Sequence, residues 1–159
     1  MSNTKIKEGM KAPEFTSIDA NNGKISLSDY KGKWIVLYFY PADDTPGCTI
    51  EAMGFTKLAK EFNKLNATIL GVSPDNCSSH QKFIDKYSLK VELLSDEGKE
   101  VQKLYGVWGK KKFMGREYTG TIRSTFLINP SGKIAKAWHN VRAKGHAEEV
   151  LDELKKKSQ

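Results

Sequence analysis

The strongest constraint on the fold of this chain is an unbroken apolar segment followed by a proline-containing turn. The segment extends from Trp34 to Phe39 and contains only aromatic, β-branched and other apolar residues. Such a run is typical of a strand buried on both faces, as in a parallel sheet. After the turn, apolar residues recur mostly at three- and four-residue steps, which predicts a helix from about residue 46 or 48 to residue 65 or 66.

Cys48 stands where the predicted strand turns into the predicted helix. The first turn of a helix has free N–H groups and a partial positive charge. A thiolate is stabilised there, and the thiolate is the reactive form of cysteine. The alternative is that Cys48 is a free cysteine that packs as a small hydrophobic residue. The position at the start of a helix favours Cys48 as a reactive nucleophile over Cys48 as a packing residue.

The turn also carries a recognisable motif, Pro41-x-x-x-Thr45-x-x-Cys48. This motif matches the P-x-x-x-T/S-x-x-C signature of the peroxiredoxins. In its full form, Tyr-Pro-Ala-Asp-Asp-Thr-Pro-Gly-Cys-Thr, it resembles the peroxiredoxin Q subfamily, also called bacterioferritin comigratory protein. Further matching segments are spread along nearly the whole chain, at residues 10–15, 71–75, 105–108, 123–128 and 145–147.

The resemblance implies a role for each residue of a peroxide site. Cys48 would be the peroxidatic cysteine, which peroxide oxidises to a sulfenic acid. The Thr45 hydroxyl would bind the peroxide, and Pro41 would form the wall of the pocket that keeps water from the thiolate. Arg123 would supply a permanent positive charge and several N–H donors. Glu51 would orient Arg123 rather than transfer protons.

Each of these residues also has a simpler interpretation. Thr45 can be a helix N-cap, and Pro41 and Pro46 can be ordinary turn residues. Arg123 can be a surface charge. Glu51 can be a first-turn carboxylate that the helix dipole favours.

The residue that would resolve the sulfenic acid departs from the subfamily pattern. Many relatives have a cysteine five residues after the peroxidatic one, where this chain has Met53, or on the following helix, near Ile84. Only Cys77 remains. Its turn should adjoin the Cys48 turn, because consecutive strands of a βαβ unit usually neighbour each other. A Cys48–Cys77 disulfide, a one-cysteine cycle with an outside thiol, an intersubunit bond and a Cys77 that only packs therefore stay open.

The other segments predict an α/β domain. We expect strands at 13–19, 24–27, 34–40, 67–73 and 93–94, and a hairpin of 124–128 with 133–138. We expect a helical turn at 28–32, a helix that begins at residues 73–76, and helices at 97–104 and 146–154. Residues 1–12 are expected to be a poorly fixed lead-in, and residues 108–122 a long loop. The predicted architecture is a single thioredoxin-like domain over residues 1–159, with a central mixed sheet flanked by helices and an N-terminal β extension.

Composition argues against several classes of protein. No apolar run approaches the roughly eighteen residues that a membrane span needs, and residues 1–7 contain no apolar segment of a secretory signal. Two cysteines do not make a disulfide scaffold, which favours the cytoplasm. The net charge of +7 comes from lysines spread along the chain, without a nucleic-acid-binding motif. The three histidines lie far apart in sequence, so metal binding lacks support.

The leading hypothesis is therefore a thiol peroxidase that reduces hydrogen peroxide and organic hydroperoxides. The resemblance implies no bound cofactor, electrons from thioredoxin, glutaredoxin or a small thiol, and a monomer or weak dimer. A thiol–disulfide oxidoreductase would need Cys-x-x-Cys, but Glu51 occupies the second cysteine position. A redox sensor or chaperone-like protein switched by oxidation of Cys48 is the remaining alternative.

Overall fold

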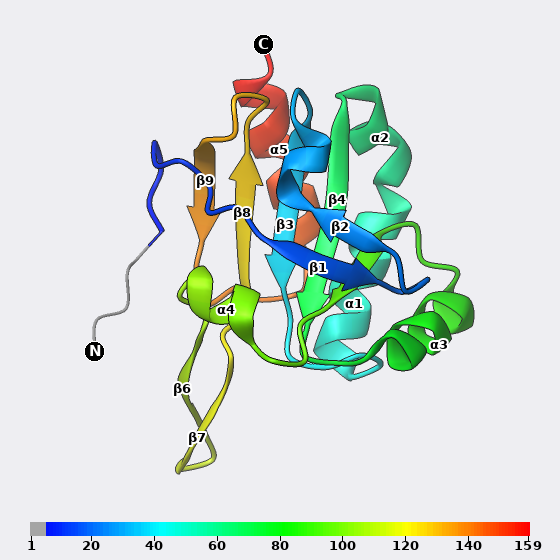
Figure 1. Cartoon of the computed structure of the whole chain (residues 1–159), viewed down its shortest axis with the longest axis vertical. Coiled ribbons are helices and arrows are strands. Elements are labelled where there is room, and N and C mark those ends of the chain that lie inside the picture. Colours follow the sequence, from blue (N-terminus) through cyan, green and yellow to red (C-terminus); the bar gives the residue numbers. More distant parts are fainter. Residues whose placement is uncertain (1–5) are drawn as a thin grey trace.

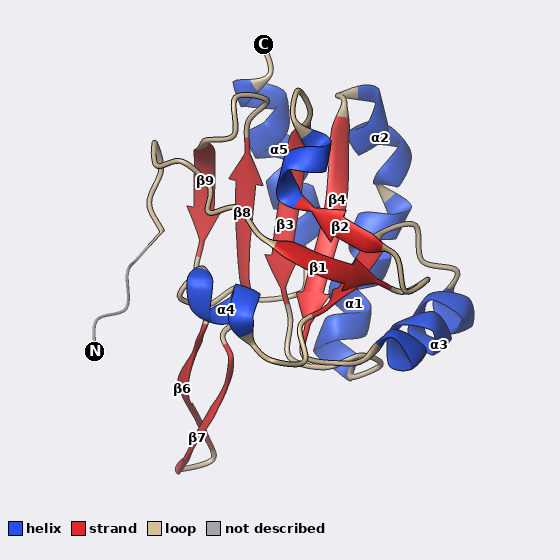
Figure 2. Cartoon of the chain, in the orientation of Figure 1, coloured by secondary structure: helices blue, strands red, loops and turns tan. Residues whose placement is uncertain are grey.

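A mixed sheet of seven strands forms the centre of the computed structural model, which describes residues 6–159 (Figures 1 and 2). The strands follow the order β2-β1-β5-β4-β3-β8-β9 across the sheet. They span β1 Thr16–Asp19, β2 Lys24–Ser26, β3 Trp34–Phe39, β4 Ala67–Ser73, β5 Glu92–Ser95, β8 Ser124–Ile128 and β9 Ile134–Trp138. The predicted mixed sheet with an N-terminal β extension is confirmed.

Strand β3 lies inside this sheet, next to the central strand β4. It pairs in parallel with β4 and antiparallel with β8. Its residues from Ile35 to Phe39 are all buried, as the apolar run predicts. Because successive side chains point to opposite faces of a sheet, the strand contributes to two cores.

The helices are η1 Leu27–Tyr30, a 3-10 turn, and α1 Pro46–Lys57, α2 Ala59–Lys64, α3 Cys77–Tyr87, α4 Glu100–Leu104 and α5 His146–Lys157. The prediction of one helix over residues 46–66 is wrong at Leu58, where φ of −99° and ψ of 5° leave the helical region. The break divides the segment into α1 and α2, and Phe55 and Phe62 on either side of it pack against each other in the core.

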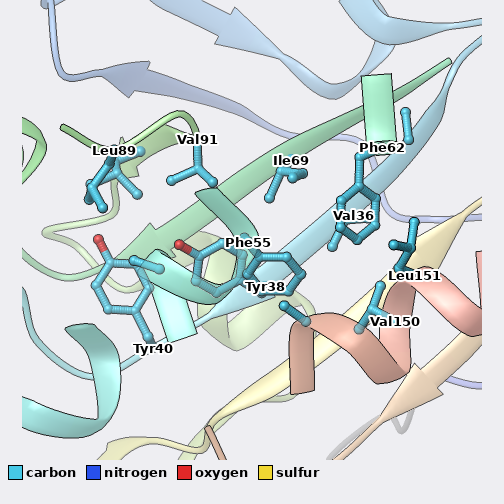
Figure 3. Close-up of a cluster of buried hydrophobic side chains, with 14 of the residues drawn as sticks. Val36, Tyr38, Tyr40, Phe55, Phe62, Ile69, Leu89, Val91, Val150 and Leu151 are labelled. Carbon is cyan, nitrogen blue, oxygen red and sulfur yellow. The ribbon is translucent and has the colours of Figure 1, made fainter. Parts of the chain in front are cut away.

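Each face of the sheet has its own hydrophobic core. Figure 3 shows the core under α1, α2 and α5, where Tyr38, Phe55, Phe62 and Val150 meet. The core on the opposite face contains Phe15, Leu37, Phe39, Tyr105 and Phe126, among other residues. Figure 1 shows the β1–β2 hairpin and α4 lying across this second face.

The prediction of a loop over residues 108–122 is wrong. These residues form a two-stranded hairpin of β6 Trp108–Phe113 and β7 Arg116–Thr121, which extends away from the central sheet in Figure 1. Met114 and Gly115 connect the strands with φ of 53° and 79°, and positive φ at both loop residues is typical of a type I′ turn. Most of these side chains face solvent, so the hairpin lacks the alternating apolar pattern that would have predicted strands.

Residues 1–12 were expected to be a poorly fixed lead-in, and residues 1–5 of this segment lie outside the described part of the chain. For residues 6–12 the prediction is wrong. Ile6 is buried, and Gly9 and Ala12 donate backbone hydrogen bonds to the carbonyls of Ile134 and Gly132 at 2.8 and 2.9 Å. The remaining predicted elements differ from the observed ones by a few residues at their ends. Within residues 6–159, no helix has both the length and the apolar character to cross a membrane.

Candidate active site

Cys48 lies in the first turn of α1, as predicted. Thr45 is the N-cap, and Pro46 and Gly47 precede the cysteine. The first bond inside the helix joins the Thr49 N–H to the Thr45 carbonyl at 2.8 Å. The N–H groups of Gly47 and Cys48 precede that bond, so they have no carbonyl partner inside α1. The cysteine is buried, with 1% of its surface exposed.

Arg123 brings a positive charge to the Cys48 sulfur from the segment between β7 and β8. One terminal nitrogen of its guanidinium donates to Cys48 Sγ at 3.3 Å. The other donates to Glu51 Oε1 at 2.6 Å, so Glu51 fixes the orientation of the guanidinium. A side chain at Gly47 would place its Cβ 3.1 Å from the first nitrogen, which shows how closely Arg123 approaches the helix.

Glu51 and Arg123 form an ion pair in which the Glu51 side chain is fully buried and the Arg123 side chain is 16% exposed. Burial of Glu51 raises its pKa to about 7, although Arg123 acts in the opposite direction. Burial also disfavours the charge of Arg123, but Glu51 and Cys48 outweigh this and raise its pKa. Arg123 is therefore charged at every physiological pH, while the charge on Glu51 changes near neutrality. Within residues 6–159, Glu51 Oε2 has no hydrogen-bond partner.

The turn between β3 and α1 contains the other two predicted residues, Pro41 and Thr45. Pro41 is half-buried and follows Tyr40, which comes directly after the last residue of β3. The Thr45 hydroxyl donates to the Ala42 carbonyl at 2.9 Å and makes no capping bond to the helix. Thr45 thus occupies the N-cap position, but its hydroxyl contacts the turn instead of the helix N–H groups.

The structure confirms that the turn after β4 adjoins the Cys48 turn, since the Asp43 N–H donates to Asp75 Oδ2 at 2.7 Å. Cys77, however, faces another part of the molecule. Its sulfur contacts the Asp19 carbonyl at 3.2 Å and the Ser95 hydroxyl at 3.7 Å, between β1 and β5. Both cysteines are free thiols in the described residues.

The histidines lie in different environments. His146 begins α5 and contacts the Thr125 hydroxyl at 2.8 Å and the Glu149 carboxylate at 3.0 Å. Its burial lowers its pKa. His80 is fully buried and contacts Asp43 beside the Cys48 turn. Sequence reasoning missed this contact, because a histidine within a helical pattern gives no sign of its partner on another element.

Comparisons with known proteins identify the family. The model of the AhpC/TSA family matches residues 9–137. The chain belongs to the AhpC/TSA family. A putative peroxiredoxin Bcp of Helicobacter pylori strain J99 is 52% identical over 94% of this chain and 99% of the relative. Peroxiredoxin Bcp of Bacillus subtilis is 46% identical over 97% and 98%.

Solved structures of peroxiredoxins agree with the fold. A cysteine-to-serine mutant of peroxiredoxin Q from Xylella fastidiosa has a TM-score of 0.92 and 37% identity over 98% of this chain and 99% of that one. Bacterioferritin comigratory protein of Xanthomonas campestris has a TM-score of 0.89 and 35% identity over 96% and 100%. The chain is thus a peroxiredoxin, a thiol-dependent peroxidase with a thioredoxin-like fold.

Proposed function

We propose that Cys48 carries the peroxidase reaction. The observation that supports this most strongly is the Arg123 guanidinium 3.3 Å from a sulfur in the first turn of a helix. The Cys48 thiolate attacks the terminal oxygen of ROOH. The S–O bond forms as the O–O bond breaks, the alkoxide RO⁻ takes a proton from solvent, and the products are a sulfenic acid and ROH.

The surrounding residues have roles that follow from this displacement. Negative charge moves from sulfur to the leaving oxygen, so a fixed guanidinium beside the sulfur can stabilise both. We assign this role to Arg123, with Glu51 holding it and the N–H groups of Gly47 and Cys48 adding further donors. Thr45 binds the peroxide, and Pro41 shields the thiolate from water.

We propose that the substrates are hydrogen peroxide and organic hydroperoxides. The Xanthomonas campestris relative has been studied for alkyl peroxide reduction. Two exposed apolar side chains of α1, Ile50 and Met53, follow Cys48 in this chain and offer apolar surface for the organic part of a hydroperoxide.

For the return to the thiol we propose a one-cysteine cycle. The Cys77 sulfur contacts Asp19 and Ser95, whereas the Cys48 sulfur contacts Arg123, and a disulfide requires Cα atoms within about 7 Å. An outside thiol attacks the sulfenic acid and releases water, and a second thiol frees Cys48 as the thiol. The reductant is thioredoxin, glutaredoxin or a small thiol, and we propose that the protein acts in the cytoplasm as a monomer or weak dimer.

Mass spectrometry after one equivalent of hydrogen peroxide tests this cycle, with the wild type compared to Cys77→Ser. We expect both proteins to gain one oxygen on Cys48. If the wild type instead loses two hydrogens while the variant gains an oxygen, Cys77 resolves the cycle and the one-cysteine proposal is wrong. If Cys48 is not rapidly oxidised in either protein, Cys48 is not the peroxidatic residue.

A further inference from the structure

His80 is a buried titratable residue that the peroxidase reaction, as described so far, does not use. The residue belongs to α3, and its side chain is fully buried. Its Nε2 lies 3.0 Å from the Leu94 carbonyl oxygen of β5, and its Nδ1 lies 2.8 Å from Asp43 Oδ2. The imidazole therefore bridges the sheet and the turn that precedes Cys48.

The partners of the ring determine where its protons lie. A carbonyl oxygen only accepts hydrogen bonds, so Nε2 must carry a proton. Another proton lies between Nδ1 and Asp43, because two lone pairs at 2.8 Å would repel each other. The contact is thus a hydrogen bond between two buried side chains, and its loss would leave a buried polar group without that partner.

Asp43 makes several hydrogen bonds in addition to its contact with His80. Its Oδ1 accepts from the Tyr40 hydroxyl at 2.6 Å, and its Oδ2 also accepts from the Ser79 hydroxyl at 2.7 Å. Its backbone N–H donates to Asp75 at 2.7 Å. These bonds join the turn to the end of β3, to the turn after β4 and to α3.

Two other interpretations of this region have less support. Ligand atoms of Asp43, Asp75 and His80 lie within 4.8 Å of one another, which suits a cation, but Oδ2 of each aspartate and both ring nitrogens already have the hydrogen-bond partners given above. The Asp44–Lys86 ion pair also joins the turn to α3, but its side chains are 41% and 59% exposed, and exposed pairs contribute little.

We propose that His80 is a positioning residue for the peroxide reaction. Through Asp43 it holds the turn of residues 41–45, so that Pro41 and Thr45 keep their places beside Cys48. The inference rests on the proposed function of those two residues. Neither His80 nor Asp43 contacts the sulfur, so the reactivity of the thiolate itself stays with Arg123 and the α1 N-terminus.

The ring also lies 3.5 Å from the Tyr40 hydroxyl through Nδ1, and two substitutions separate its shorter contacts with Asp43 and Leu94. In His80→Asn the amide N–H can replace Nδ1 and reach Asp43, while the contact with Leu94 is lost. In His80→Gln the amide N–H can replace Nε2 and reach Leu94, while the contact with Asp43 is lost. Lys86→Ala is the matched control, because it removes an exposed ion pair between the turn and α3 and leaves the buried His80–Asp43 contact in place.

The experiment measures single-turnover oxidation of Cys48 by hydrogen peroxide, its alkylation by iodoacetamide and the thermal midpoint of each variant. We expect His80→Gln to react with peroxide at least about tenfold more slowly, and His80→Asn and Lys86→Ala to stay within about threefold of the wild type. Alkylation should not slow in any of them, because the thiolate keeps its stabilising groups. If His80→Gln does not fold, Asp43→Ala removes the contact from the turn, together with the bonds from Tyr40 and Ser79, and should show the same selective loss.

A His80→Gln protein as fast with peroxide as the wild type would overturn the inference. Equal losses in His80→Asn and His80→Gln would overturn it too, since they would assign His80 a packing role. Failure of the proposed function looks different, because the wild type itself would then react with peroxide no faster than a free thiol.

Discussion

The ion pair of buried Glu51 with Arg123 makes the stability of the folded protein depend on pH. Arg123 stays charged, whereas burial places the pKa of Glu51 at about 7, above its usual value of 4.5. Between these two values the folded protein binds more protons than the unfolded chain. Folding stability must therefore fall as pH rises through this window, because ionisation of Glu51 is penalised only in the folded state.

Glu51→Gln should remove this pH dependence. Each pKa unit corresponds to about 1.4 kcal/mol, so the wild type should lose roughly 2–3 kcal/mol more than the variant between pH 4.5 and pH 8. Urea unfolding of both proteins across that range measures the difference. If the two stability curves run parallel, burial does not raise the pKa of Glu51 in the way described.

Which site residues could be predicted depended on their separation in sequence. Pro41, Thr45 and Cys48 lie in one turn, so the spacing of the motif placed them together. Arg123 was found only through resemblance to a family, since nothing in its own segment connects it to Cys48. His80 and Asp43 are 37 residues apart, and neither the helical pattern nor the turn indicated that they meet.

At the scale of elements, the close packing of β3 on β4 depends on Gly71. Gly71 is the register partner of Tyr38, and a Cβ at this position would lie 2.7 Å from the tyrosine ring and 2.9 Å from Leu93. The Tyr38 ring is buried and stacks on Phe55 at 4.8 Å, so it has little room to move.

Gly71→Ala should therefore destabilise the protein by about 1–3 kcal/mol through overpacking. Gly109→Ala is the matched control, because Gly109 is also in a strand but its Cβ would meet only Ile122, at an ordinary 3.4 Å. Chemical denaturation of both variants gives the comparison. A Gly71→Ala protein as stable as the control would contradict the packing described for this strand pair.

Elements with one or both faces buried were easier to predict than exposed ones. The run from Trp34 to Phe39 and the apolar face of α5 gave strands and helices close to the observed ones. The β6–β7 hairpin was missed, because backbone pairing and a Met114–Gly115 turn define it while most of its side chains face solvent. The positive φ values of Met114 and Gly115, which define that turn, cannot be predicted from a hydrophobic pattern.

On the scale of the whole molecule, the order of strands brings the functional segments together. β3 has β4 on one side and β8 on the other, so the turn that carries Cys48 lies between Asp75, after β4, and Arg123, before β8. The parallel β3–β4 neighbourhood followed from the βαβ pattern. The antiparallel pairing of β3 with β8 did not, because segments about ninety residues apart can be arranged in many ways.

The most direct test of the account is the rate of Cys48 oxidation by hydrogen peroxide in stopped flow, for the wild type and Arg123→Lys. Lysine keeps a positive charge but cannot donate to Cys48 and Glu51 with one planar fork. Loss of a fixed donor to a developing charge costs about 10²-fold or more in rate. We expect a wild type far faster than a free cysteine and a variant slower by about that factor. A wild type no faster than free cysteine, or a variant equal to the wild type, would contradict the assignment of Cys48 and Arg123.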